Sequence, residues 1–153
     1  MSKFVKIAYK SMRLVLCGIA VLLFVQCKKA ELMVAMSDVN IKNWDETATI
    51  KRVNEDTVTY YDLNIVLHVN SHFNSDDIEL EVTMTSPDAI RHTERVSLTC
   101  NSERDGVAAH SNDIEIPYRR DARLSVEGTY TFSLRPLKPL TGVEAAGIHF
   151  QKR

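Results

Sequence analysis

Two stretches of the sequence decide the fold: YYDLNIVLHVN at residues 60–70 and DIELEVTMTSPD at residues 77–88. In both stretches apolar and polar side chains alternate along the chain, with Val66 as the one apolar exception on the polar face. This alternation is typical of a β-strand that has one face in the core and the other in solvent. The inward-facing residues would be Tyr61, Leu63, Ile65, Leu67, Val69, Ile78, Leu80, Val82 and Met84.

Shorter versions of this pattern run through the rest of the chain. They are LMVAMSDVNI (32–41), TATIKRV (47–53), RVSLTC (95–100), DIEIPY (113–118), GTYTFSL (128–134) and AGIHF (146–150). Segments rich in turn-forming residues separate them: HFNSDD (72–77), SPDA (86–89), NSERDG (101–106), RRDARLSVEG (119–128) and LKPLTG (137–142). Seven or eight short strands at this spacing predict one all-β domain over residues 37–153, an antiparallel β-sandwich that is either Ig-like or jelly-roll-like.

The N-terminus has the three parts of a secretory signal peptide. A basic segment, MSKFVKIAYKSMR, precedes the apolar run Leu14–Val25, after which the sequence turns polar. Twelve apolar residues are too few for a spanning helix, which needs about 20. Residues 1–26 are therefore predicted to be a signal peptide, with a short uncleaved membrane anchor as the alternative. The segment holds four basic residues and no acid, which leaves 15 basic and 20 acidic residues in an acidic body.

Cys27 follows the apolar run after a single polar residue, Gln26. This arrangement resembles the signal peptides of bacterial lipoproteins, whose lipobox ends in the cysteine that becomes acylated. Val25 fits that pattern and Phe24 is tolerated, whereas Gln26 stands where a small residue is usual. The resemblance implies lipidation of Cys27, residues 27–36 as a tether, and a membrane partner bound through more than one acyl chain such as palmitate. A disulfide to Cys100 would be possible in an oxidising compartment, but a cysteine at the end of a polar tail is a poor staple.

Several residue types that could carry chemistry also have simpler interpretations. His68 and His72 have a spacing seen in some metal sites, but on a strand such side chains lie about 13 Å apart. Cys100 could be a nucleophile, yet its period places it with the core. Three carboxylate pairs could serve glycosidase chemistry, although each lies in or beside a turn where solvated side chains are expected. The pairs are Asp45-Glu46, Glu55-Asp56 and Asp76-Asp77.

The chain contains no glycine-rich phosphate loop, no G-x-S-x-G and no H-E-x-x-H. It is therefore predicted not to be an enzyme and to hold no cofactor. Arg119, Arg120 and Arg123 form a short basic segment that includes Asp121 and is expected to be an exposed loop, so no nucleic-acid partner is predicted. Trp44, the sole tryptophan, would either plug one end of the sandwich or mark a recognition surface.

The order of the motifs resembles the gliding-motility lipoprotein H family of Bacteroidota. That family has Y-D-L-x-L, T-S-P-D-G, E-I-P and G-T-Y-T-F segments in the order found over residues 40–151. Ala89 stands where glycine is usual after S-P-D, and the loop between Cys100 and Asp113 is less similar. The resemblance implies an envelope lipoprotein associated with gliding motility and the type IX secretion machinery, and it implies no catalytic residues.

The sequence hypothesis is a non-catalytic cell-envelope lipoprotein that acts as an accessory or scaffold component through contacts with other envelope proteins. The alternative is a ligand-binding or glycan-binding surface lipoprotein, which would need an aromatic platform built from residues such as Trp44, Tyr60 and Tyr118. The outer membrane is the expected location, because Lys28 and Lys29 do not resemble an aspartate-type retention signal for the inner membrane.

Overall fold

The computed structural model describes residues 33–100 and 112–153, in which eight strands follow one another. Cys27 and the predicted signal peptide lie outside the described residues. The strands are β1 (Val34–Asp38), β2 (Ala48–Asn54), β3 (Tyr60–Val69), β4 (Asp77–Thr85), β5 (Arg91–Thr99), β6 (Asn112–Arg123), β7 (Gly128–Pro136) and β8 (Val143–Lys152). Among the described residues, no helix is long and apolar enough to cross a membrane.

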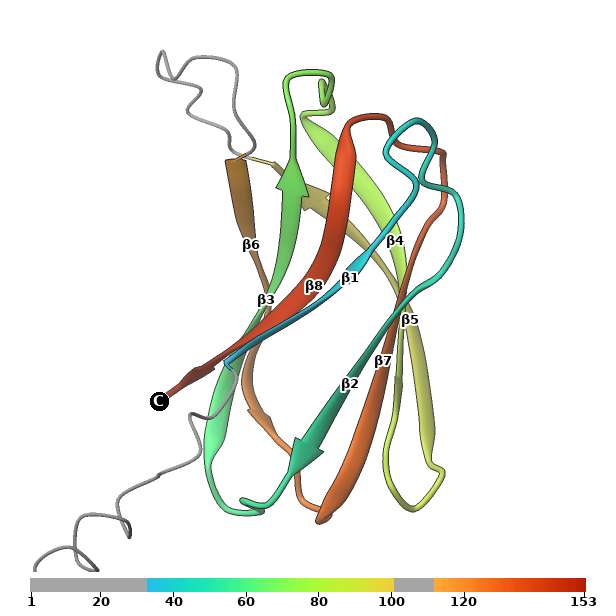
Figure 1. The fold of residues 1–153 in the computed structure, drawn as a ribbon. Coiled ribbons are helices and arrows are strands. Elements are labelled where there is room, and N and C mark those ends of the chain that lie inside the picture. Colours follow the sequence, from blue (N-terminus) through green and yellow to red (C-terminus); the bar gives the residue numbers. More distant parts are fainter. Residues whose placement is uncertain (1–32, 101–111) are drawn as a thin grey trace, which may run out of the picture. The chain divides into compact units, whose positions relative to one another are not determined.

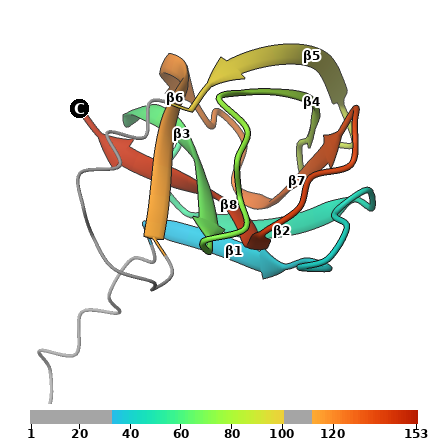
Figure 2. The same ribbon diagram turned by 90° about the horizontal axis from the view of Figure 1, so that it is seen from above.

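The strands form two four-stranded antiparallel sheets, shown in Figures 1 and 2. One sheet has the order β1-β8-β3-β6 and the other the order β2-β7-β4-β5. Edge strand β1 contacts edge strand β2, and β5 contacts β6 at the opposite edge, so the sheets lie face to face. This interleaved order is the jelly-roll arrangement of eight strands. The predicted β-sandwich is confirmed, and the topology decides between the two variants.

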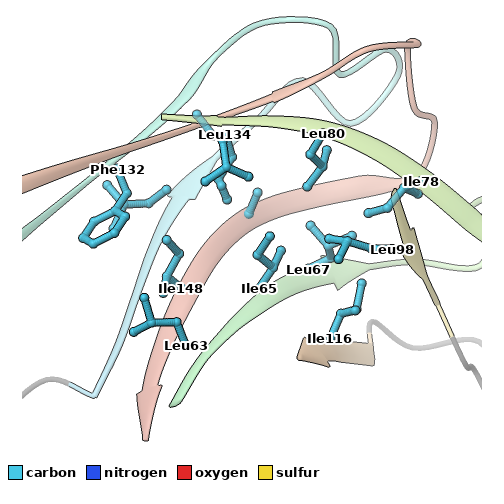
Figure 3. Close-up of a cluster of buried hydrophobic side chains, with 14 of the residues drawn as sticks. Leu63, Ile65, Leu67, Ile78, Leu80, Leu98, Ile116, Phe132, Leu134 and Ile148 are labelled. Carbon is cyan, nitrogen blue, oxygen red and sulfur yellow. The ribbon is translucent and has the colours of Figure 1, made fainter. Parts of the chain in front are cut away.

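The core fills the space between the sheets with the inward faces predicted from the alternation. Leu63, Ile65 and Leu67 of β3 point toward Leu80 of β4 and Leu134 of β7 (Figure 3). All of these side chains are buried. Each one removes enough apolar surface from water to contribute about 1.5–3 kcal/mol. Cross-sheet packing of these rows is therefore what holds the sandwich together.

The outward-facing Val66 is also buried, for a local reason. It pairs with Gly147 on β8, and Gly147 pairs in turn with Met36 on β1. A Cβ at Gly147 would lie 2.6 Å from the Met36 Cγ. The Met36 side chain therefore occupies space that is free only because residue 147 is a glycine. The result is a small apolar patch on the outer face of this sheet.

Two boundaries differ from the sequence prediction. Strand β1 begins at Val34, within the tether predicted for residues 27–36, because its pairing with the middle of β8 starts there. The RRDARLSVEG segment is a strand up to Arg123 rather than a turn throughout. Strand β6 continues through an irregularity opposite β3, where Asp121 has a φ of 54° and its N–H donates to Asp62 Oδ1 at 3.1 Å. A β-bulge of this kind absorbs turn-forming residues without ending the strand.

The SPDA segment is a turn, as predicted. The Ala89 N–H donates to the Ser86 carbonyl at 3.0 Å, and Pro87 occupies the second turn position. Ala89 has a φ of 65°, the left-handed region in which a Cβ is strained. The residue that follows Ser-Pro-Asp here therefore has a backbone conformation that favours glycine.

Ala89→Gly is expected to stabilise the protein by about 0.5 kcal/mol in urea unfolding. Relief of the left-handed strain, about 1–2 kcal/mol, exceeds the extra unfolded-state entropy of glycine, about 0.5–1 kcal/mol. The matched control is Ala122→Gly in β6, where φ is not positive and the same change should destabilise. Equal destabilisation by both variants would contradict the prediction.

Candidate functional site

Trp44 closes the end of the sandwich at which the β1–β2 and β7–β8 loops meet. Its backbone N–H donates to the Leu140 carbonyl at 2.8 Å, and the Leu140 N–H donates to the Trp44 carbonyl at 3.0 Å. The indole Nε1 donates to the Glu46 carbonyl at 2.9 Å, and the side chain is 0% exposed. The prediction that Trp44 plugs one end is confirmed, and its alternative role as a recognition surface is wrong.

Trp44→Ala is expected to lower the free energy of unfolding by about 3–5 kcal/mol, because it empties a fully buried site. Urea unfolding followed by far-UV circular dichroism measures this. Ile41→Ala in the same loop is the control, since Ile41 is 41% exposed and should change stability by no more than about 0.5 kcal/mol. Similar stability in the two variants would contradict the plug.

His68 and His72, which have the spacing of some metal sites, lie in different settings and make different contacts. His68 faces outward from β3, with Nδ1 2.6 Å from Asp113 Oδ1 and Nε2 3.7 Å from Glu144 Oε2. His72 lies exposed in the β3–β4 turn, where its backbone N–H donates to Asn70 Oδ1 at 2.9 Å. Within residues 33–100 and 112–153, no group of three or more His, Cys, Asp or Glu side chains could hold a metal ion.

The outer face of β3, β6 and β8 carries a second polar group beside His68. Glu115 accepts hydrogen bonds from Asn64 Nδ2 and contacts His149 Nδ1 at 2.7 Å. Partial burial alone would raise the pKa of Glu115, but the contacts with Asn64 and His149 hold it below its usual value. These side chains therefore pair with one another across the strands, as polar groups on a sheet surface commonly do.

Cys100 is a core residue, as its period predicts. Its side chain belongs to the buried cluster, and its backbone N–H donates to the Asp76 carbonyl at 2.6 Å. Burial raises the pKa of the thiol, and the nearby carboxylates of Asp77 and Asp76 raise it further. A nucleophilic cysteine needs the opposite shift. The core interpretation of Cys100 is confirmed.

The paired carboxylates serve turns and strand ends. Asp56 accepts hydrogen bonds from the Thr59 hydroxyl and from the backbone N–H groups of Thr59 and Val58, and these bonds lower its pKa. Asp77 accepts a bond from the Thr99 hydroxyl at 2.7 Å. Asp45 and Glu46 are exposed beside Trp44. The described contacts of these carboxylates are thus with turn and strand neighbours.

The basic segment of β6 is divided among separate contacts. Arg119 bonds to Glu94, whereas the Arg123 guanidinium lies 5.8 Å from the centre of the Tyr60 ring. Arg120 is exposed. The predicted exposed loop is instead a strand, on which Arg119 and Arg123 make separate contacts.

A second polar cluster ties the edge strands β5 and β6 together. Glu94 pairs with Val82, whose side chain is in the core, so Glu94 points toward the opposite sheet. Its Oε1 accepts hydrogen bonds from the Tyr118 hydroxyl and from Arg119, and His92 Nε2 lies 3.9 Å away. The cluster bridges one open edge of the sandwich.

The pKa values of Glu94 and Tyr118 are both displaced away from neutral pH. The hydrogen bond from Tyr118 and the charge of Arg119 hold the pKa of Glu94 below its usual value, although partial burial opposes them. Burial and the same hydrogen bond raise the pKa of the Tyr118 phenol. A general acid or base works best with a pKa near the working pH. The geometry therefore suits a structural latch between the sheets rather than proton transfer.

Two of the residues that matter at the ends and edges escaped the sequence analysis. Arg52 lies among the core residues, with its guanidinium 4.3 Å from the Phe150 ring centre and 5.4 Å from that of Tyr61. Arg52 is in phase with Ala48 and Ile50, which face the core, and this spacing was the sequence signal for its burial. Glu94 is likewise in phase with Val96 and Leu98, but its partners Tyr118 and Arg119 lie on β6 and could not be read from the local pattern.

Glu94→Gln is expected to lower stability by about 1 kcal/mol at pH 7, because the charge-assisted bonds to Tyr118 and Arg119 are weakened while partial exposure limits the loss. The folded-state pKa of Glu94 lies below the usual 4.5, so its contribution is complete above that pH and is lost as pH falls through the folded value. The stability difference between Glu94→Gln and the unaltered protein should therefore shrink as the pH falls below 4.5.

Glu79→Gln is the matched control on the exposed face, where Glu79 lies 3.5 Å from Lys138 and the pair should contribute little. If Glu94→Gln left the pH dependence of urea unfolding unchanged, the stabilising role of Glu94 between the two sheets would be contradicted.

Comparison with known proteins gives no family assignment. No family model matches the sequence, and no curated protein matches it. Among solved structures, a carbohydrate-binding module specific for non-crystalline cellulose is similar at a TM-score of 0.41 and 6% identity, over 72% of this chain and 70% of that chain.

Proposed function

We propose that the chain is a lipid-anchored protein of the cell envelope that works through contacts with other proteins. The observation that carries the proposal is the position of Cys27. It follows a 12-residue apolar run and precedes a folded domain whose first strand starts at Val34. A short tether between an acylated cysteine and a sandwich raises the local concentration of the domain near membrane partners.

The polar clusters support a role in contacts rather than in catalysis. Glu94 is held ionised and Tyr118 is held protonated, so neither group is suited to exchange protons near neutral pH. The Cys100 thiol is buried in the core with a raised pKa. An accessory or scaffold role in the outer membrane, related to gliding motility and type IX secretion, is the form of the proposal that the motif resemblance favours.

The glycan-binding alternative loses most of its aromatic platform. Trp44 is buried at one end of the sandwich, and Tyr118 donates its hydroxyl to Glu94 at one edge. Tyr60 is exposed, but it lies near Arg123 at the opposite end from Trp44. Stacking on sugar rings needs exposed aromatic faces, and these three side chains do not share a surface.

Cys27→Ala is expected to abolish incorporation of an alkyne fatty acid and to release the protein from the membrane fraction, because the anchor requires acyl chains on that sulfur. Metabolic labelling, detergent phase partitioning and outer-membrane fractionation measure both effects. Cys100→Ala is the control, since this buried thiol should take up no label. A labelled, membrane-bound Cys27→Ala protein would overturn the proposal, whereas pull-down of envelope proteins with the labelled unaltered chain would support it.

A further inference from the structure

Exposed apolar side chains gather at one end of the sandwich. Of the six large hydrophobic residues that are exposed in the described structure, four lie in or beside two loops at this end. They are Val58 (75% exposed), Val53 (66%), Ile90 (65%) and Tyr60 (48%). Single exposed hydrophobics are ordinary, but clustered ones mark contact surfaces.

Three loops converge at this end, which we call the loop end: residues 54–59, 86–90 and 124–127. Asn54 Nδ2 donates to the Leu124 carbonyl at 2.8 Å and to the Val126 carbonyl at 3.0 Å. Pro87 packs so closely on the start of β7 that a Cβ at Gly128 would lie 2.9 Å from its Cβ. In Figure 1 these connections all lie at the bottom of the sandwich. The loop end is thus a built surface held by contacts between its loops.

The apolar residues of the loop end point in several directions. Val53 faces outward from β2, because its neighbours in the alternation, Arg52 and Asn54, face inward. Tyr60 faces outward from the other sheet, since Tyr61 is in the core. Val58 and Ile90 lie beyond or at the ends of the strands. A flat protein partner would reach only one of these sides, whereas a surrounding medium would reach all of them.

Three carboxylates at or near the loop end are bonded to other groups of the protein. Asp56 accepts three hydrogen bonds from its own turn, Asp88 accepts one from the Ser86 hydroxyl, and Asp121 pairs with Arg153. Glu55 and Glu127 remain exposed. Tyr60 beside Arg123 combines an aromatic ring with a long cationic side chain, a pair that suits the boundary between water and lipid headgroups.

The start of the described chain lies nearer to this end than to the other. The Met33 carbonyl accepts a hydrogen bond from the Phe150 N–H at 2.7 Å, and Phe150 pairs with Leu63. From the level of Leu63, the start of β3 at Tyr60 is about 10 Å away and the end of β3 at Val69 is about 20 Å away, at 3.3 Å per residue.

Five residues lie between Cys27 and Met33, and the six Cα-to-Cα steps that join them can span at most about 20 Å. The loop end is therefore within reach of a membrane-bound Cys27 with slack to spare. The opposite end, with Trp44 and Ile41, would be reached only by a fully extended tether.

The geometry points to the loop end as a membrane-contact surface: Val53, Val58, Tyr60 and Ile90 lie at the headgroup layer of the bilayer that holds Cys27. This inference rests on the proposed lipidation of Cys27. This placement orients the sandwich relative to the membrane. The end that Trp44 covers points away from the membrane and is accessible to envelope partners.

The test places one fluorescent label at either end of the full acylated protein, through Val58→Cys or Ile41→Cys. The matched control Ile41 is an exposed hydrophobic residue at the opposite end. Each protein is reconstituted into phosphatidylethanolamine and phosphatidylglycerol vesicles that contain a lipid with a nitroxide near the headgroup. The label at position 58 is expected to be quenched several-fold more strongly than the label at position 41. Adding Ile90→Ser should reduce that quenching, and adding Val53→Ser should reduce it further.

Mass spectrometry of the Cys27 peptide from the same samples separates the two proposals. An acylated protein whose two labels are quenched equally would overturn the orientation and leave the lipoprotein proposal standing. A protein without acyl chains would overturn the lipoprotein proposal, and absence of quenching at position 58 would then overturn both. The label at position 58 could instead be shielded from a water-soluble quencher in whole envelopes but not in vesicles that contain no other protein. That result would assign the loop end to a protein partner and overturn the bilayer assignment.

Discussion

The structure depends on the packing of the apolar face of β3 against the facing sheet. Leu63, Ile65 and Leu67 meet Leu80 and Leu134 in the middle of the core, and all are buried. Each sheet has one face that cannot remain in water, so the two sheets must stay face to face. That requirement leaves two open ends and two open edges. The residues with specific roles outside the core packing, such as Trp44 and Glu94, lie at those boundaries.

Different side chains cover the ends and edges of the sandwich in different ways. Trp44 fills one end, where only a large side chain can cover the core between two loops. Arg52 lies between aromatic rings toward the other end, which gives a buried cation a favourable setting. Glu94 accepts bonds from Tyr118 and Arg119 across one edge, which prevents that edge from exposing the core. The loop end is the boundary that keeps its apolar side chains outside.

Much of this fold was predictable because strand alternation is a local property. The inward residues of β3 and β4 were identified from their period, and Cys100 was placed in the core for the same reason. The extent of β6 was not predictable, because its turn-forming residues are absorbed by a bulge that needs β3 as a partner. Trp44 had two interpretations, of which the plug was favoured, until Leu140, nearly a hundred residues away, was placed beside it.

The sequence by itself determined that the body of the chain is a sandwich of short antiparallel strands and that Cys27 is the candidate anchor, since both follow from patterns within a few residues. Only the tertiary structure decided the jelly-roll strand order, the latch at Glu94 and the convergence of Val53, Val58, Tyr60 and Ile90 at one end. These features join residues far apart along the chain. Their positions are set by how the sheets pack, which local alternation does not encode.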